Sequence, residues 1–269
     1  MAPPYVTFLT DYGLDDDFVG VCHAVIARIA PEARVIDLTH GIPRHDVHRA
    51  AVLLRAALPY LPDGVHVTVV DPEVGSPRRP VALRTNGGRV MVGPDNGALL
   101  PAADHHGGVA EAYDVSASPW RLEPVSATFH GRDIFCPVAA HLATGEPLAG
   151  AGEPVDPMEL RRLDLPEPHV DGDEVLAHVM TIDRFGNAPL DVSHDQLTEW
   201  GFKLGRRVVV AAGEFELPAQ YARTFADVDP GELLLYEDAW RTLAVAINRG
   251  DAAKALGLAP GAEVRLREA

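Results

Sequence analysis

The run VHVTVV at residues 65–70 constrains the fold most, because it is apolar without a clean alternation of sides. A strand with one face in water alternates apolar and polar residues, whereas a strand buried on both faces does not. Runs of strand-forming residues recur at 6–10 and 33–39, and a helical pattern follows each, with Asp46 as the start signal of the second helix. The turn Asn86-Gly87-Gly88 between two further apolar runs predicts a hairpin. Strands that alternate with helices are typical of a mainly parallel sheet covered by helices. We therefore expect an α/β fold in the N-terminal half.

The pattern changes near Gly150, where prolines become frequent and helical periodicity is lost. A proline-rich segment is an extended, semi-stiff connector. Beyond it, short apolar runs separated by turns predict mostly antiparallel strands, with one short helix near Asp251–Leu256. The sequence thus predicts an α/β domain at 1–155, a Pro-rich linker at 156–168 and a smaller β-barrel-like domain at 169–269.

Composition argues against several classes of protein. The net charge of −16, from 23 basic and 39 acidic residues, does not suit nucleic acid, which selects basic surfaces. The longest apolar runs are shorter than the roughly 20 residues of a membrane helix, and the N-terminus lacks the basic region of a signal peptide. Cys22 and Cys136 have apolar neighbours and are expected to be buried, reduced thiols. We expect a cytoplasmic protein that binds neither nucleic acid nor membranes.

Ionisable residues follow apolar runs at the points where strands should end. Asp71 and Arg78 lie in VVDPEVGSPRR (69–79), and His130 lies in TFHGRDIF (128–135). Such positions would form the open edge of the sheet, where α/β folds bind ligands. Residue types alone favour a surface ion pair with an incidental histidine.

Several segments in the same order resemble one family, the S-adenosyl-L-methionine (SAM) hydrolases, also called SAM hydroxide adenosyltransferases. The halogenating enzymes, fluorinases and chlorinases, are relatives of this family. The resemblance rests on the two segments above together with TDYGLDDDFVG (10–20), VIDLTHGIP (35–43), VGPDNG (92–97) and IDRFGNA (182–188). It implies hydrolysis of SAM to adenosine and L-methionine without a metal or organic cofactor. It also implies a homotrimer, with each site between the first domain of one chain and the second domain of its neighbour.

The resemblance implies roles for the matching positions. Asp71, Arg78 and His130 would hold the attacking water in line with the C5′–S bond of the substrate. A carboxylate is a poor base for free water, so Asp71 would orient it while Arg78 favours its hydroxide character. Arg79 is the neighbour that could take the place of Arg78. The implied substrate-binding residues are Asp11 for the ribose, Asp183 and Asn187 for the methionine end, and Phe129, Gly131 and Asn96.

Two segments depart from the family pattern. The loop on the adenine side often reads Asn-Ser-x-Gly or Asp-Ser-x-Gly, but here it reads Asp238-Ala239-Trp240-Arg241, which leaves adenine binding open. Glu73 stands where glycine is usual, and it adds a negative charge near the predicted water.

Three other hypotheses stay open. A metal-dependent hydrolase is suggested by Asp15, Asp16, Asp17, His40, His45 and His48. Acids at a helix start are ordinary dipole compensation, however, and two histidines three apart on a helix lack the base of an HExxH motif. A halide transferase is the second hypothesis, but the Asp71 carboxylate would repel an anion. The third is a SAM- or adenosine-binding protein without catalysis.

Overall fold

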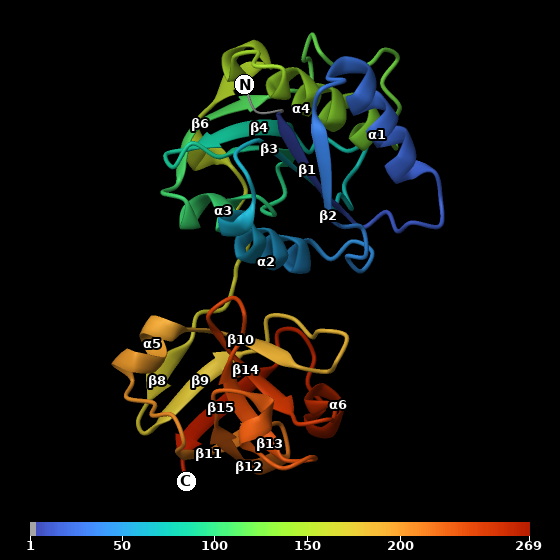
Figure 1. Ribbon diagram of the computed structural model, residues 1–269. Helices are drawn as coiled ribbons and strands as arrows, with labels where there is room; N and C mark the ends of the chain where they lie inside the picture. The colour runs from blue at the N-terminus through green and yellow to red at the C-terminus, as the bar shows by residue number, and fades with distance from the viewer. Residues whose placement is uncertain (1–3) are drawn as a thin grey trace. The chain divides into compact units, whose positions relative to one another are not determined.

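The computed structural model describes residues 4–269, which divide after Asp164 into two compact units (Figure 1). Unit 1 ends at Asp164, and unit 2 comprises Leu165–Ala269. Each unit has its own sheet and its own hydrophobic core, and each is described by itself. Within residues 4–269, the helices are too short or too polar to cross a bilayer.

The sheet of unit 1 has the strand order β2-β1-β3-β5-β4-β6-β7. Its strands are β1 (Tyr5–Thr10), β2 (Arg34–Thr39), β3 (Val65–Val69), β4 (Pro80–Thr85), β5 (Val90–Pro94), β6 (Val109–Asp114) and β7 (Glu153–Val155). The pairings from β2 to β5 are parallel, whereas those from β5 to β7 are antiparallel. The sheet is therefore mixed, and the prediction of a mainly parallel sheet is wrong. The reason is local, since β4 and β5 form the hairpin expected at Asn86-Gly87-Gly88, and a tight turn joins only antiparallel strands.

Helices cover both faces of this sheet, with α1 and α4 on one face and α2 and α3 on the other (Figure 1). The helices are α1 (Phe18–Ile29), α2 (Val47–Ala57), α3 (Leu100–His105) and α4 (Cys136–Ala143), with short turns η1 (Leu58–Tyr60), η2 (Gly131–Phe135), η3 (Leu148–Gly150) and η4 (Pro157–Glu159). Asp46 caps α2 as expected, because its side chain accepts from the Arg49 N–H at 2.9 Å. His45 lies before this helix, so its expected place on one helix with His48 is wrong.

Strand β3 is buried along its whole length, as the run at 65–70 predicted. It pairs with β1 in a register that sets Thr10 opposite Val69. Asp11 and Asp71 consequently emerge from neighbouring parallel strands at the same edge of the sheet. His130 reaches its place differently. No strand directly precedes it among the described residues, and it begins the π-helical turn η2 that runs into α4.

The sheet of unit 2 has the order β10-β14-β13-β12-β11-β15-β9-β8, and only β12 and β13 pair in parallel. The mostly antiparallel prediction is confirmed. A bridge between Val179 and Leu190 joins the region beyond β9 to β10 and curls the sheet into a half-barrel. Its elements are β8 (His169–Asp171), β9 (Glu174–His178), β10 (Ala188–Ser193), α5 (His194–Glu199), β11 (Arg207–Ala212), β12 (Phe215–Tyr221), η5 (Phe225–Asp227), β13 (Leu233–Glu237), β14 (Thr242–Ile247), α6 (Ala252–Leu256) and β15 (Glu263–Glu268).

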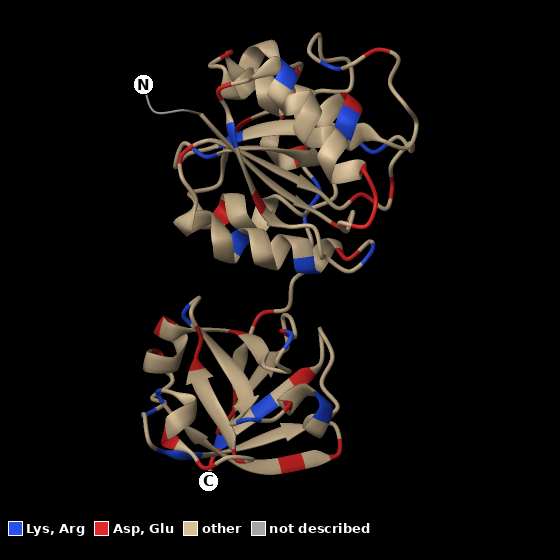
Figure 2. Ribbon diagram, turned by 45° about the vertical axis from the view of Figure 1, so that its right-hand side comes forward, with Lys and Arg blue, Asp and Glu red and all other residues tan. Residues whose placement is uncertain are grey.

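Charged residues are spread over both units. Figure 2 shows Lys and Arg on several helices, strands and loops of each unit, interspersed with Asp and Glu. The acidic excess seen in composition is therefore spread along the chain and is not confined to one element.

Candidate active site

The structure brings Asp71, Arg78 and His130 together at the edge of unit 1. Arg78 Nε donates to Asp71 Oδ1 at 3.1 Å, and Arg78 Nη2 contacts Asp71 Oδ2. The same Nη2 lies 3.1 Å from His130 Nδ1. The Arg78 side chain is 0% exposed and that of Asp71 is 6% exposed, so this two-pronged ion pair is withdrawn from water.

The contact with Arg78 fixes the tautomer of His130. A guanidinium has only donors, so His130 Nδ1 must accept its hydrogen bond. Burial lowers the pKa of His130, and the positive charge of Arg78 lowers it further. The imidazole is then neutral near pH 7 and carries its proton on Nε2. His130 can thus present an N–H donor to a bound molecule.

Burial also raises the pKa of the Asp71 carboxyl, and the charge and hydrogen bonds of Arg78 oppose that rise. The guanidinium has one buried nitrogen to spare, because Arg78 Nη1 makes no hydrogen bond with any residue from 4 to 269. A buried donor without a partner is rare, and a water molecule is the usual means of satisfying it. Asp71 and Arg78 together can therefore accept from and donate to one water.

The neighbouring arginine faces elsewhere. Arg79 Nη2 donates to Asp95 at 3.1 Å and to the Glu159 carbonyl at 2.9 Å. Arg78 is therefore the arginine at Asp71, although the two are adjacent in sequence.

A pocket of about 460 Å³ opens beside the triad. Asp71 and His130 line it, as do the predicted residues Asp11, Phe129 and Gly131. The further lining residues are Tyr12, Asp16, Phe18, Arg44, His45, Val69, Val74 and Thr128. The volume suits a ligand of the size of a nucleoside derivative, since small-molecule sites span about 300–1,000 Å³.

An aromatic cluster forms part of this pocket. Phe129 packs edge-to-face on Tyr12 and Phe18, with ring centroids 5.9 and 5.1 Å apart. The faces of such rings attract cations. Tyr12 and Phe18 lie within the quoted segment 10–20, but sequence reasoning did not select them, because contact with Phe129 arises only in the fold.

Asp11 is held by the loop before α2. The backbone N–H of His45 donates to Asp11 Oδ2 at 2.9 Å, and His45 has a φ of 67°. A positive φ is uncommon for residues other than glycine. The sequence offered His45 only as a candidate metal ligand, and neither His45 nor its neighbour Arg44 was predicted to line the substrate pocket.

Four predicted residues do not line this pocket, and the first is the buried Arg78. Asn96 donates to the Val70 carbonyl at 2.8 Å and accepts from the Ala98 N–H at 3.2 Å, so it fixes the chain just before Asp71. In unit 2, Asp183 accepts from the Asn187 side chain at 2.7 Å and from the Phe185 N–H at 2.7 Å. Asp183 and Asn187 thus form one hydrogen-bonded turn.

The two departures from the family pattern have local partners. Glu73 forms an ion pair with Arg161. In unit 2, Asp238 Oδ1 accepts from the N–H groups of Trp240 and Thr242, at 2.8 and 3.0 Å, and Arg241 has a φ of 61°. Asp238 therefore serves as a turn former in that loop.

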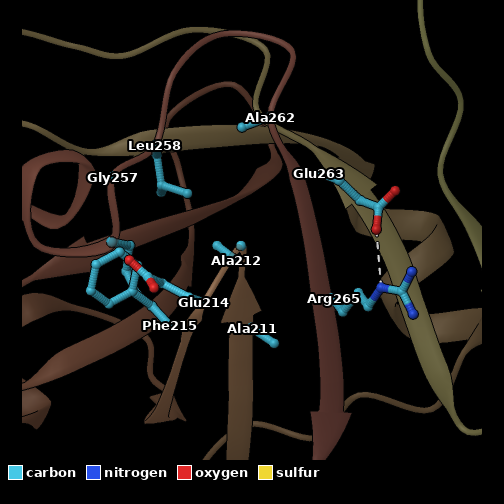
Figure 3. Close-up of a pocket in the computed structure, with 11 residues that line it drawn as sticks. Ala211, Ala212, Glu214, Phe215, Gly257, Leu258, Ala262, Glu263 and Arg265 are labelled. Atoms are coloured by element: carbon cyan, nitrogen blue, oxygen red, sulfur yellow. Dashed lines mark hydrogen bonds and ion pairs between the residues drawn. The ribbon is translucent and has the colours of Figure 1, made fainter.

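Unit 2 holds a larger pocket, of about 880 Å³ (Figure 3). It lies among the β11–β12 turn, the end of α6 and the start of β15. Small and apolar residues line most of it, and Glu263 pairs with Arg265 at 3.0 Å. None of the predicted site residues lines this pocket, and it lacks the convergent polar groups of the pocket in unit 1.

Comparison with known proteins gives the family. The SAM hydroxide adenosyltransferase N-terminal domain matches residues 6–152, and the C-terminal domain matches residues 177–265. An (R)-S-adenosyl-L-methionine hydrolase from Salinispora tropica is 49% identical over 267 residues, or 99% of each chain. A fluorinase from Actinopolyspora mzabensis is 29% identical, over 98% of this chain and 97% of its own. An uncharacterized conserved protein from Thermotoga maritima, solved as a crystal structure, is 37% identical with a TM-score of 0.93, over 98% of this chain and 100% of its own. The resemblance seen in the motifs is confirmed, and the chain belongs to the SAM hydroxide adenosyltransferase family.

Proposed function

We propose that this protein hydrolyses S-adenosyl-L-methionine to adenosine and L-methionine. The observation that carries the proposal is the hydrogen-bonded set of Asp71, Arg78 and His130, in which Asp71 and His130 line a pocket that also holds Asp11. The hydrolase from Salinispora tropica, 49% identical over nearly the whole chain, supports the same activity.

The chemistry is a direct substitution at the ribose C5′. The substrate sulfonium is already a good leaving group, so no acid is needed to protonate it. An O–C5′ bond forms as the C5′–S bond breaks, the bonding electrons pass to sulfur, and L-methionine leaves as a neutral thioether. The proton of the attacking water is released to solvent.

The triad holds the nucleophile for this step. Asp71 accepts a hydrogen bond from the water, and its oxygens keep free lone pairs while Arg78 is bound. The spare Nη1 of Arg78 and the Nε2–H of His130 donate to its oxygen. Positive charge at Arg78 favours hydroxide, and a fixed position near C5′ lowers the entropic part of the barrier.

The rest of the pocket binds substrate. One carboxylate can accept from both ribose hydroxyls, which suits Asp11, held by the His45 N–H at 2.9 Å. The rings of Tyr12, Phe18 and Phe129 suit the sulfonium charge. Gly131 leaves room for the ligand, and no metal or organic cofactor takes part in the reaction.

Product analysis tests the reaction. Purified protein is incubated with SAM and EDTA, and the products are separated by chromatography; adenosine and methionine should accumulate in equal amounts. Methylthioadenosine as product, or no turnover, overturns the proposal. Parallel samples with chloride or fluoride should give no halogenated nucleoside, since Asp71 repels anions.

Substitutions test the roles. Asp71→Ala, Arg78→Ala and His130→Ala should each lower kcat by about 10²-fold or more while SAM still binds, because these residues hold water. Asp11→Ala should instead weaken SAM binding. Arg79→Ala is the matched control and should keep its activity, because Arg79 faces Asp95 and Glu159. A fully active Asp71→Ala variant would refute the water-holding role.

The proposal extends to assembly and location. Asp183 and Asn187 of one chain complete the site of a neighbour in a homotrimer, where their carboxylate and amide bind the methionine zwitterion. Inactive His130→Ala and Asp183→Ala chains should regain activity when mixed by unfolding and refolding. No recovery, or a monomer by light scattering, argues against this assembly. A cytoplasmic location is supported by two buried cysteines that form no disulfide.

A further inference from the structure

Three side chains that can bind a metal meet outside the residues assigned to the reaction: His23 on α1, Asp37 on β2 and His40 directly after β2. His23 Nε2 lies 2.9 Å from Asp37 Oδ1, and His40 Nε2 lies 3.0 Å from the same oxygen. The three ligand atoms all lie within 4.8 Å of one another. Neither Asp37 nor His23 drew attention in the sequence, because α1 and β2 bring them together only in the fold.

The fold gives this cluster one buried and two accessible ligands. Strand β2 is the edge strand of the sheet, so Asp37 keeps 39% of its side chain exposed, and His23 keeps 36%. His40 has 2% exposed, and the Phe8 ring packs edge-on against its imidazole with centroids 5.0 Å apart. An ion can therefore enter from solvent onto a ligand whose orientation is already fixed.

Hydrogen bonds within this cluster leave one buried nitrogen, His40 Nε2, without a partner among the described residues. His23 and Asp37 form one hydrogen bond. His40 Nε2 is buried and makes no hydrogen bond with any residue of the described chain, although Asp37 Oδ1 is 3.0 Å away. Its other nitrogen, Nδ1, is 2.8 Å from Thr10 Oγ1. When Nδ1 donates to Thr10, Nε2 presents a lone pair toward the carboxylate, which is the arrangement of a metal ligand with an outer hydrogen bond.

The spacing also suits an ion. Ligand atoms about 2.1 Å from a tetrahedral Zn²⁺ ion are about 3.4 Å apart. The two Nε2–Oδ1 distances, 2.9 and 3.0 Å, therefore need to lengthen by only about 0.5 Å to admit the ion. Two imidazoles and a carboxylate select a transition metal rather than Mg²⁺ or Ca²⁺, which prefer oxygen ligands only.

We propose that His23, Asp37 and His40 bind Zn²⁺, with water completing its coordination. The family resemblance implied a protein without a metal, so this proposal departs from that expectation. The proposed role of the ion is structural and not catalytic. The ion joins α1 to the edge strand. Through the His40–Thr10 hydrogen bond, and the Gly13 N–H that donates to the His40 carbonyl at 2.8 Å, it also steadies the segment that carries Asp11.

Metal titration of untagged protein tests the site. After treatment with EDTA and its removal, Co²⁺ is titrated by visible absorption and Zn²⁺ by calorimetry. One ion per chain should bind, with a Co²⁺ ligand-field band, and Zn²⁺ should raise the melting temperature. His23→Ala and Asp37→Asn should each weaken binding by at least about 10-fold.

His48→Ala is the matched control, because His48 is an exposed histidine on α2 away from the cluster. It should bind both ions like the parent. Melting of the metal-free proteins checks that His23→Ala and Asp37→Asn are folded, which is expected for partly exposed side chains. The absence of one-to-one binding in the parent, or equal binding by the folded His23→Ala and Asp37→Asn variants, overturns the proposal.

Discussion

Replacing Gly131 with alanine should damage the pocket while leaving the fold nearly intact. A Cβ atom at Gly131 would approach the Tyr12 hydroxyl closer than 3.0 Å, a separation that Cβ atoms essentially never show, and would lie 3.2 Å from Tyr12 Cζ. Normal contact needs roughly 3.5 Å, so the phenol must move by about 1 Å. Tyr12 lines the pocket and packs on Phe129, and its movement therefore changes the substrate site.

The Gly131→Ala substitution should lower activity much more than it lowers the free energy of unfolding. Overpacking costs about 1–3 kcal/mol. Gly131 begins the helical turn η2, where alanine is favoured over glycine by about 0.5–1 kcal/mol, so the net loss of stability should be small. Misplacement by about 1 Å next to the reacting groups can cost about 10²-fold in rate. We expect kcat/KM to fall by about 10- to 100-fold.

A double-mutant cycle with Tyr12→Phe isolates the cause. This substitution removes the clashing oxygen and leaves the ring carbon at the tolerable 3.2 Å. Gly131→Ala should then cost much less activity in the Tyr12→Phe background, with a coupling of about 1–3 kcal/mol in kcat/KM. An active Gly131→Ala enzyme, or an equal loss in both backgrounds, refutes the reasoning.

Three further outcomes are expected. Burial lowers the pKa of His66 to about 4, against about 6.5 when unfolded, so the unfolded chain binds more protons between these values. The free energy of unfolding should then fall by up to about 3 kcal/mol as the pH drops through this range. When it is measured by urea unfolding at several pH values, the free energy should depend less on pH in the His66→Gln variant than in the parent. Hydrolysis needs an ionised Asp71 and a neutral His130, so kcat measured against pH should decrease on the acid side. Arg78→Ala leaves the buried Asp71 unpaired, and its loss of about 3–5 kcal/mol in unfolding experiments should shrink in the Asp71→Ala/Arg78→Ala double variant.

Sequence patterns predicted what depends on local chemistry. The buried strand at 65–70, the cap at Asp46 and the turn at Asn86-Gly87-Gly88 all follow from short-range preferences, and each is present. The place of Asp71 follows from the end of β3. These features need no knowledge of which distant segments meet.

Features that depend on long-range pairing were not predictable in this way. The hairpin was expected, but periodicity does not say that β6 and β7 add beside β4 and make the sheet mixed. Adjacent arginines look alike in residue type, so the resemblance rather than local chemistry selected Arg78, and the fold turns Arg78 to Asp71 and Arg79 to Asp95. Likewise, His23 and Asp37 share no local pattern.

The low contribution of the buried Asp71–Arg78 ion pair to stability indicates why the protein has this pair. Removing two charges from water costs several kcal/mol each, and apolar residues of similar volume often replace such a pair at no loss of stability. Arg78 also keeps a buried nitrogen without a protein partner, which adds to that cost. A pair that contributes so little to the fold is better explained by the reaction, because a charge already desolvated and fixed needs no rearrangement when hydroxide forms. The same argument explains why the neighbouring Arg79, which is one-third exposed and bound to Asp95 and Glu159, makes the suitable control.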